Sequence, residues 1–310
     1  MTLQKYKKRI FAPKSNVMNE NPFTENLKQS TGMRIFIYLV ILLICSLLGG
    51  LSSFFLVIGS NDTLLKIGQG FSSAMMFIVP PIVYYCLTRK ERPMQALGFR
   101  QIRPIWMLLV GAALMFLSLP VTNQLTDWNE GMKLGGVFQQ LEELLRNMEE
   151  TAEAITERML NADNIGGLLF NLLIIALIPA VGEELTFRGV LQQSLTRGLK
   201  NPHVAIWLSA ALFSFIHFQF YGFLPRMFLG LLLGYLFYTT GSLWTSILMH
   251  FLNNGTAVVL YYLNSKGIVN VDVDHFGATD KVWLIALSVV VTVGLIVWSW
   301  RKKEANPTQI

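Results

Sequence analysis

A pair of adjacent glutamates, Glu183 and Glu184, lies near the end of an apolar stretch whose composition is that of a membrane-spanning helix. An ionisable side chain inside a bilayer costs about 2.5–3.5 kcal/mol on insertion scales, so it persists mainly where it is paired, lines a wet cavity or takes part in chemistry. Arg188 follows Glu184 by four residues, so these two side chains share a helix face. Glu183 is rotated by about 100° and faces elsewhere. The spacing predicts that Glu184 and Arg188 compensate each other and leave Glu183 to serve as a base.

Two later apolar segments carry the other candidate groups. His217 follows Phe213 by four residues, and Asn254 follows His250 at the same spacing, so each pair lies on one helix face. An imidazole beside an amide NH donor can polarise a carbonyl or stabilise the oxyanion that forms when it is attacked. The residue types alone leave three interpretations open: hydrolysis, a satisfied polar network that holds helices together, and transport through a polar pathway.

Sequence patterns of other chemistries are absent. The chain has no His-Glu-x-x-His, no Gly-x-Ser-x-Gly and no Gly-rich phosphate loop after a strand. Its two cysteines form no CxxC pair, so neither a disulfide framework nor a thiolate zinc site is indicated. Zincin, serine-nucleophile and nucleotide chemistry therefore lack their usual sequence support.

The composition is that of a membrane protein. Of the 310 residues, 53% are hydrophobic and 14% are charged, whereas a soluble domain carries about 25% charged residues. Long uncharged runs alternate with short charged loops, as expected for helices that cross a hydrocarbon core of about 30 Å. We predict an all-α polytopic membrane helical bundle with about eight transmembrane helices. The predicted spans are 35–58, 67–87, 105–121, 165–188, 204–220, 223–238, 243–263 and 282–300.

The basic residues are distributed unevenly between the predicted loops. Of the 25 Lys and Arg residues, 18 lie in 1–34, 88–104, 188–203 and 301–310. Cytoplasmic loops collect Lys and Arg, so both termini are predicted to be cytoplasmic, in agreement with an even number of spans. The net charge of +6 marks the face near anionic lipid and requires no nucleic acid. We expect a multi-pass integral protein of a bacterial-type cytoplasmic membrane.

One long loop, 124–164, stands apart because it is acidic and amphipathic. Its apolar residues recur every three or four positions, which predicts a helix with an apolar stripe opposite its glutamates. We expect this extracytoplasmic helix to pack on the protein or cover its outer end, as a solvated cap without a catalytic part. The other parts of the single domain are a basic N-terminal segment (1–34), three spans (35–123), a four-span core (165–263), a last span (282–300) and a cytoplasmic tail (301–310).

Three motifs carry a resemblance to a known family: Glu-Glu-x-x-x-Arg at 183–188, Phe-x-x-x-His at 213–217 and His-x-x-x-Asn at 250–254. In this order, each in its own predicted span, they resemble the motifs of the CPBP family. That family includes CAAX prenyl endopeptidases of the Ras-converting type and bacteriocin-processing or immunity proteins, also called the Abi family. The resemblance covers about 165–260 and implies an intramembrane endopeptidase whose site is open toward the cytoplasm.

The resemblance also implies roles for individual residues. Glu183 with His217 would activate a water molecule, and His250 with Asn254 would bind the scissile carbonyl oxygen as charge develops. The supporting residues would be Glu184, Arg188 and Phe213. Members of the family are commonly labelled metalloproteases, and zinc, if used, would be held by Glu183, His217 and His250. Because the ligand spacing differs from that of the usual zinc proteases, we expect a metal-independent mechanism that requires no cofactor.

The implied substrate is a membrane-associated or lipidated peptide, for which the prenylated C-terminal CAAX peptide is the best-known class of the family. The expected partners are therefore a peptide or lipidated protein and membrane lipid, with no nucleic acid. Two alternatives stay open. One is a non-enzymatic immunity or scaffold protein that retains the motifs without turnover, and the other is an ion-coupled transporter.

Overall fold

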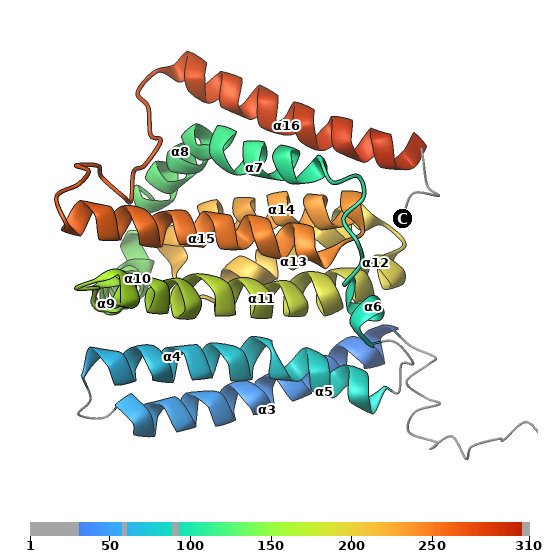
Figure 1. Cartoon of the computed structure of the whole chain (residues 1–310), viewed down its shortest axis with the longest axis horizontal. Coiled ribbons are helices and arrows are strands. Elements are labelled where there is room, and N and C mark those ends of the chain that lie inside the picture. Colours follow the sequence, from blue (N-terminus) through green and yellow to red (C-terminus); the bar gives the residue numbers. More distant parts are fainter. Residues whose placement is uncertain (1–30, 58–60, 89–92, 306–310) are drawn as a thin grey trace, which may run out of the picture.

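In the computed structural model, residues 31–57, 61–88 and 93–305 are described. Within these ranges the regular elements are helices, and no strand is formed (Figure 1). This confirms the predicted all-α class. Most of the predicted basic N-terminal segment and the end of the predicted tail, residues 1–30 and 306–310, lie outside the described residues.

Most helices follow one another with short connections, and a longer loop, 266–281, precedes the last helix. Those that matter for the site are α3 (Thr31–Val57), α4 (Asp62–Phe77), α5 (Val79–Leu87), α6 (Pro93–Leu97), α7 (Met107–Leu117), α8 (Leu119–Glu130), α9 (Gln139–Leu160), α10 (Ile165–Asn171), η2 (Leu172–Leu177), α11 (Ile178–Glu184), η3 (Leu185–Gln192), α12 (Gln193–Leu199), α13 (Pro202–Phe215), η4 (Phe220–Gly222), α14 (Phe223–Thr240), α15 (Leu243–Ser265) and α16 (Val282–Ala305).

Several helical segments are long and apolar enough to cross a membrane. Within the described ranges there are five, or up to six if the pair α7 and α8, bent by 42°, forms one span. This supports an integral membrane protein, although the predicted number of about eight spans is not confirmed. The five segments are Thr31–Phe54, Asp62–Leu87, Ile165–Leu199, Phe220–Thr240 and Val282–Lys303.

The long helices lie side by side along the longest axis of the molecule (Figure 1). The helices α3 to α5 form one side, α11 packs between α4 and α15, and α7, α8 and α16 form the other side. Helix α12 and the C-terminal end of α16 lie at one end of the bundle, here named the α12 end. Helix α9 lies across the opposite end, named the α9 end, where it contacts α4, η4 and α15.

The segment from α10 to α12 is a continuous helical stretch that contains two π-helical parts, η2 and η3, on either side of α11. Such wide turns inside an α-helix occur often at functional sites. The sequence predicted a span that ends near Arg188, but the helix continues to Leu199. The reason is that two of its polar side chains find carbonyl partners on α14: Arg188 donates to the Gly230 carbonyl at 2.7 Å, and Gln192 donates to the Gly234 carbonyl at 3.0 Å. The glutamate pair therefore lies within the helical stretch rather than at its end.

Helix α13 is shorter than the span predicted for it. It ends at Phe215 rather than near 220, so His217 lies in the turn that follows the helix. Phe218, the next residue, has a φ of 53°, a left-handed conformation that bulky residues rarely adopt. Because the helix is short and the turn is sharp, His217 lines a cavity whose wall also includes residues of α9.

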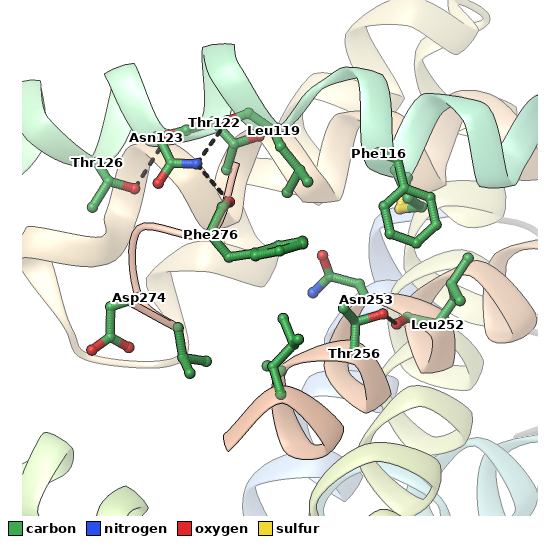
Figure 2. A pocket seen from close by; sticks show the side chains of 14 residues that line it. Phe116, Leu119, Thr122, Asn123, Thr126, Leu252, Asn253, Thr256, Asp274 and Phe276 are labelled. Atoms are coloured by element: carbon green, nitrogen blue, oxygen red, sulfur yellow. Dashed lines mark hydrogen bonds between the residues drawn. The ribbon is translucent and has the colours of Figure 1, made fainter. Parts of the chain in front are cut away.

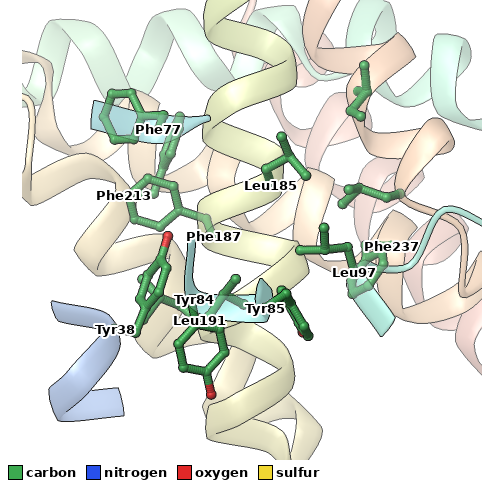
Figure 3. Packing of buried hydrophobic residues seen from close by; sticks show 13 residues of the cluster. Tyr38, Phe77, Tyr84, Tyr85, Leu97, Leu185, Phe187, Leu191, Phe213 and Phe237 are labelled. Carbon is green, nitrogen blue, oxygen red and sulfur yellow. The ribbon is translucent and has the colours of Figure 1, made fainter. Parts of the chain in front are cut away.

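A buried cluster rich in aromatic residues packs around the part of the helical stretch that follows the glutamate pair (Figure 3). Tyr38 donates a hydrogen bond to the Thr186 hydroxyl at 2.9 Å, and Thr186 donates to the Phe77 carbonyl at 3.0 Å. Helices α4 and α11 touch through Gly182, where an added Cβ would lie 2.8 Å from the Cβ of Phe77. The residue before Glu183 is thus held against α4 at a distance that only glycine permits.

Helix α9 packs on the protein, as one of the two sequence expectations stated. Met159 is buried with Leu65 and Ile174 in a small apolar cluster. The ammonium group of Lys66 donates to the Asn161 carbonyl at 2.6 Å just beyond the end of α9. The C-terminal end of α9 is therefore fastened to α4 and to η2.

Candidate active site

Glu184, Arg188 and His250 form a buried group that we name the inner cluster. The guanidinium Nη1 of Arg188 lies 2.6 Å from Oε1 of Glu184, so the pairing predicted from the spacing of four is present. The imidazole Nδ1 of His250 lies 2.9 Å from the same oxygen. The three side chains are 0–2% exposed. A buried charge is tolerated only with partners and hydrogen bonds, which the three side chains supply through Oε1 of Glu184. Oε2 of Glu184 and Nε of Arg188 are buried without a hydrogen-bond partner.

His250 lies between the two adjacent glutamates. Its Nδ1 carries a proton that it donates to Glu184, because a carboxylate in an ion pair only accepts. Its Nε2 lies 3.7 Å from Oε2 of Glu183. The sequence assigned Glu184 only to the compensation of Arg188, but the structure also makes Glu184 the group that orients His250. No spacing signal could have shown this contact, since the two residues are 66 positions apart.

The ring of Phe213 contacts several side chains of the site. Its ring packs edge-on against the rings of Phe187, His217 and His250, with centroid distances of 5.2, 5.2 and 5.9 Å. The guanidinium carbon of Arg188 lies 5.1 Å from the centroid of the same ring. Figure 3 shows Phe213 among the aromatic residues of the buried cluster. Phe213 was expected to support the site, and its ring packs directly on both histidines.

Glu183 and His217 line one cavity of about 440 Å³, which is in the size range of ligand pockets, about 300–1,000 Å³. The two side chains interact electrostatically. Nδ1 of His217 donates to the Phe213 carbonyl at 2.7 Å, so a neutral ring leaves Nε2 as the acceptor nitrogen. The rest of the wall comes from α4, α9 and the η2–α11 segment: Gln69, Ser72, Ser73, Met76, Phe77, Ala152, Ile155, Thr156, Met159, Ile174, Ile175 and Pro179, with Ile216 and Gln219 beside His217.

Asn254 lies one helical turn beyond His250 on α15, as the spacing predicted. Its side-chain oxygen accepts a hydrogen bond from Asn253 at 3.1 Å, which directs the amide nitrogen elsewhere. It is not among the residues that line the cavity of Glu183 and His217. Of the four catalytic residues predicted from the sequence, Glu183, His217 and His250 come together, whereas Asn254 is a neighbour of the group.

A second cavity, of about 170 Å³, lies between α8, α15 and the loop before α16 (Figure 2). Asn123 closes one side of it by donating to the Leu119 and Phe276 carbonyls at 2.9 and 3.1 Å. Asn253 and Asp274 also line this cavity, but neither the glutamate pair nor a motif histidine does. Of these two cavities, only the larger is lined by residues of the motifs.

A further group at the cavity was not identified from the sequence. We name it the α9 latch: the carboxylate of Glu149 on α9 with the groups that bind it, which are the Gln219 side chain, the Tyr221 backbone N–H and the Arg226 guanidinium. The apolar stripe of the acidic loop indicated that Ala152, Ile155 and Met159 would face the protein, and they line the cavity. Glu149 itself was one acidic residue among many, with no distinguishing signal.

The residues suggested for zinc do not form a recognisable ligand group. In the part of the chain that the structure describes, no three His, Cys, Asp or Glu side chains are grouped so that they could hold a metal ion. Glu183, His217 and His250, the zinc ligands suggested by the resemblance, are therefore not grouped as a metal site in the described part of the chain. We derive no step through a metal.

The fold and the site define a helical membrane protein with a buried carboxylate–histidine centre. Comparison with known families agrees: the model of the family described as type II CAAX prenyl endopeptidase Rce1-like matches residues 165–256. All three motifs lie within the matched segment, which confirms the resemblance to the CPBP family there and supports a CAAX-type intramembrane protease in general. Helices α3 to α9 and α16 lie outside it. No curated protein and no solved structure matches the chain.

Proposed function

We propose that the chain is an intramembrane endopeptidase that cleaves a membrane-associated or lipidated peptide with a water molecule activated by Glu183. The observation that carries the proposal is the meeting of Glu183 with His217 in one cavity, directly beside a histidine that is oriented by a buried ion pair. A positioned carboxylate or imidazole is what general acid–base catalysis requires.

The reaction follows from the positions of these groups. The Glu183 carboxylate takes a proton from water while the water oxygen attacks the carbonyl carbon of the scissile peptide bond. His217 orients the water through Nε2, the nitrogen that its bond to the Phe213 carbonyl leaves as an acceptor. When the C–N bond breaks, Glu183 returns the proton to the leaving amine nitrogen. Glu183 thus ends the cycle as it began, and no other reactant is needed.

The oxyanion of the intermediate needs hydrogen-bond donors. Because Nδ1 of His250 donates to Glu184, His250 can donate to the oxyanion only through a protonated Nε2, so the doubly protonated ring is the competent form. Carboxylates on both sides of the ring, Glu184 at 2.9 Å and Glu183 at 3.7 Å, balance that charge. The amide NH2 of Asn254 is the second proposed donor, after a rotation toward the cavity.

The position of the cavity in the bundle indicates from which side of the membrane a substrate would enter it. The cavity is lined by α9, at the opposite end of the bundle from the C-terminal end of α16 (Figure 1). With the C-terminus in the cytoplasm, as the distribution of basic residues favours, the cavity lies toward the outer side of the membrane. We therefore propose an outward-facing site, in contrast to the cytoplasmic site that the resemblance implies.

The orientation is tested by labelling from one side. In a chain without Cys45 and Cys86, single cysteines are introduced as Gln140→Cys on α9 and Lys302→Cys on α16, both at exposed positions. A membrane-impermeant maleimide added to intact cells should label Gln140→Cys and not Lys302→Cys. Labelling of Lys302→Cys alone would reverse the orientation and place the cavity on the cytoplasmic side.

The activity is tested with Glu183→Gln and Glu183→Ala in the purified protein and a library of peptides. General acid–base catalysis contributes about 10²–10⁴-fold, so both variants should lose at least about 100-fold in cleavage rate. Glu150→Gln, at an exposed position on α9, is the matched control and should cut at the wild-type rate. Unchanged cleavage by both Glu183 variants would disprove the mechanism. Protection or partner binding that survives loss of both Glu183 and His250 would instead favour the non-enzymatic alternative.

A further inference from the structure

The carboxylate of Glu149 lies in a cradle of donors beside the proposed catalytic cavity. Its Oε1 accepts from the Gln219 amide at 3.0 Å and lies 3.7 Å from Nη2 of Arg226. Its Oε2 accepts from the Tyr221 backbone N–H at 3.2 Å. An amide, a backbone N–H and a guanidinium that converge on one carboxylate are what a protein uses to bind such a group. The cradle is therefore an anion site that the protein's own side chain occupies.

The turn after α13 builds this cradle independently of α9. Nη1 of Arg226, in the first turn of α14, donates to the Gln219 carbonyl at 3.1 Å and fixes that residue next to the guanidinium. A side chain on Gly222 would overlap the Arg226 guanidinium, so the lack of one leaves room for it. The three donors thus belong to the segment from Gln219 to Arg226. They would stay in place if Glu149 moved away.

The cradle is close to the groups that would carry out the reaction. Gln219 lines the same cavity as Glu183 and His217. Arg226 is tied to Gln219 by the bond from its Nη1 to the Gln219 carbonyl. A carboxylate bound in the cradle is therefore held by a residue of the cavity wall.

Helix α9 is held in a way that allows it to move. The chain enters it through Gly135 and Gly136, whose φ values of 52° and 54° lie in the left-handed region that glycine adopts without strain. Neither glycine has other atoms near the place where a Cβ would lie. Its N-terminal turns are bonded mainly to the entering loop itself, since Glu142 accepts from the Gly135 N–H and Arg146 donates to the Met132 carbonyl, and Arg146 also lies 4.3 Å from the centroid of the Tyr221 ring. Its C-terminal end is fastened to α4 and η2 by Met159 and by the bond from Lys66 to Asn161. Glu149 lies between these ends, so a swing about the fastened end would withdraw it.

We propose that Gln219, the Tyr221 backbone N–H and Arg226 form a carboxylate-binding subsite of the protease, which Glu149 occupies until a carboxylate of the peptide substrate replaces it. This inference rests on the proposed function and adds the chemical class of group that positions the substrate. The carboxylate can come from the C-terminus of the peptide or from an Asp side chain. Helix α9 is then the cover of the cavity, and substrate binding displaces it.

Three peptides that differ only at the C-terminus distinguish these sources. The first has a free C-terminal carboxylate, the second has a C-terminal amide, and the third is an amide with Asp in place of the last residue. The full-length protein should cut at least one carboxylate peptide with a kcat/KM about tenfold or more above that of the plain amide, since hydrogen bonds to charged groups are strong. A preference for the free acid identifies the C-terminus as the source, and a preference for the Asp peptide identifies the side chain. Equal cleavage of all three peptides would overturn the subsite.

Variants test whether the preference comes from the cradle. Arg226→Gln should reduce the ratio between carboxylate and amide peptides to near one, and Arg226→Lys should restore part of it. Glu149→Gln removes the competing charge and should raise kcat/KM for the preferred peptide, whereas its neighbour Glu150→Gln should leave it unchanged. A loss of activity in Arg226→Gln that is equal for all three peptides would mean a structural role and would contradict the proposal.

A readout without turnover separates this proposal from the proposed function. In Glu183→Gln, hydrogen–deuterium exchange across 143–153 should increase when the carboxylate peptide is added, because Glu149 is displaced, and stay unchanged with the amide. If no peptide is cut but this response occurs, the protease is wrong and the carboxylate site stands. If peptides are cut without any carboxylate preference or exchange response, the subsite is wrong and the protease stands. If neither is observed, both are overturned.

Discussion

Two arginine–glutamate sites lie near the proposed catalytic cavity, and they differ in burial. In the inner cluster, Arg188 and Glu184 are 1% and 0% exposed and their charged atoms are 2.6 Å apart. In the α9 latch, Arg226 and Glu149 are 24% and 14% exposed and the closest charged atoms are 3.7 Å apart. The same pair of residue types is thus enclosed and tight in one site, and partly hydrated and loose in the other.

The difference shows how burial decides what an ion pair can do. Opening a buried pair leaves charges in a medium of low polarity, so the inner cluster stays closed and can hold His250 in one orientation. Water can replace a partner in a partly exposed pair at little cost, so the α9 latch can exchange Glu149 for another carboxylate. The inner pair is suited to positioning and the latch to exchange. Five predictions test this contrast, from the largest expected effect to the smallest.

The first prediction concerns the loss of one buried charge. Arg188→Met leaves Glu184 enclosed without its cation, which should cost about 3–5 kcal/mol of unfolding free energy. Thermal and denaturant unfolding in detergent would measure it. The double variant Arg188→Met with Glu184→Gln removes both charges and should lose less than the single variant. A single variant as stable as wild type would contradict the contrast.

The second prediction concerns the orientation of His250. Glu184→Gln keeps the shape of the side chain but weakens the acceptor for Nδ1, so the rate of peptide cleavage should fall by about 100-fold, the lower range for a general acid–base group. The rate is measured at saturating peptide, with Glu150→Gln as the control. Cleavage within a few-fold of wild type would show that His250 does not depend on the inner cluster.

The third prediction concerns the contact that positions α11. Gly182→Ala would place a Cβ 2.8 Å from the Cβ of Phe77 and 3.0 Å from Cγ1 of Ile78. Overpacking of this kind costs about 1–3 kcal/mol, which exceeds the gain in helix propensity of about 1 kcal/mol. Gly50→Ala is the matched control, because nothing lies within 4 Å of its added Cβ in α3. The control should unfold at or above the wild-type temperature, and similar behaviour of Gly182→Ala would contradict the close contact.

The fourth prediction concerns the partly exposed pairs. The pair of Arg158 with Asp62 joins α9 to α4 at 2.7 Å but is more than half exposed. Arg158→Met should change the unfolding free energy by no more than about 1 kcal/mol, the usual range for surface pairs. Glu149→Gln should also lose far less than Arg188→Met in the same assay. A loss comparable to that of Arg188→Met would mean that α9 is a fixed part of the core.

The fifth prediction concerns pH at the start of α9. The pKa of Glu142 is lowered below its ordinary value of 4.5, mainly by the hydrogen bond from the Gly135 backbone and next by the hydrogen bond from Arg146. Because the folded pKa is depressed, the contribution of Glu142 is present above about the ordinary value and is lost as the pH falls through the lower folded value. Hydrogen exchange of residues 134–142, compared at matched intrinsic rates, should rise over that acidic range in wild type and stay flat in Glu142→Gln. Parallel curves would contradict this.

The sequence was sufficient for features that depend on local spacing. The period of the apolar residues predicted helices throughout and an amphipathic helix in the acidic loop, and α9 occupies Gln139–Leu160. The spacing of four predicted the pair of Glu184 with Arg188, which is present. Helix ends were less predictable: the segment continues past Arg188 to Leu199 because Gln192 and Arg188 find carbonyl partners on α14. A sequence pattern does not show such partners.

The candidate site was predicted in part. The motifs named Glu183, His217 and His250, and the structure brings them together: Glu183 and His217 line one cavity, and Nε2 of His250 lies 3.7 Å from Oε2 of Glu183. The packing of α9 on the protein was expected, but the contacts of Glu149 could not be predicted, because an acidic amphipathic helix has the same pattern whichever of its glutamates finds a partner.

The amino-acid sequence by itself determined the helical membrane class, the pair of Glu184 with Arg188 and the identity of the polar residues inside the apolar segments. These follow from side-chain type and helical period, which act over four or fewer residues. Only the tertiary structure decided that Glu184 orients His250, that Glu183 and His217 share a cavity, and that Glu149 occupies the cradle at Arg226. Such contacts join distant helices, and the packing that removes them from water decides which groups must pair and which can exchange partners.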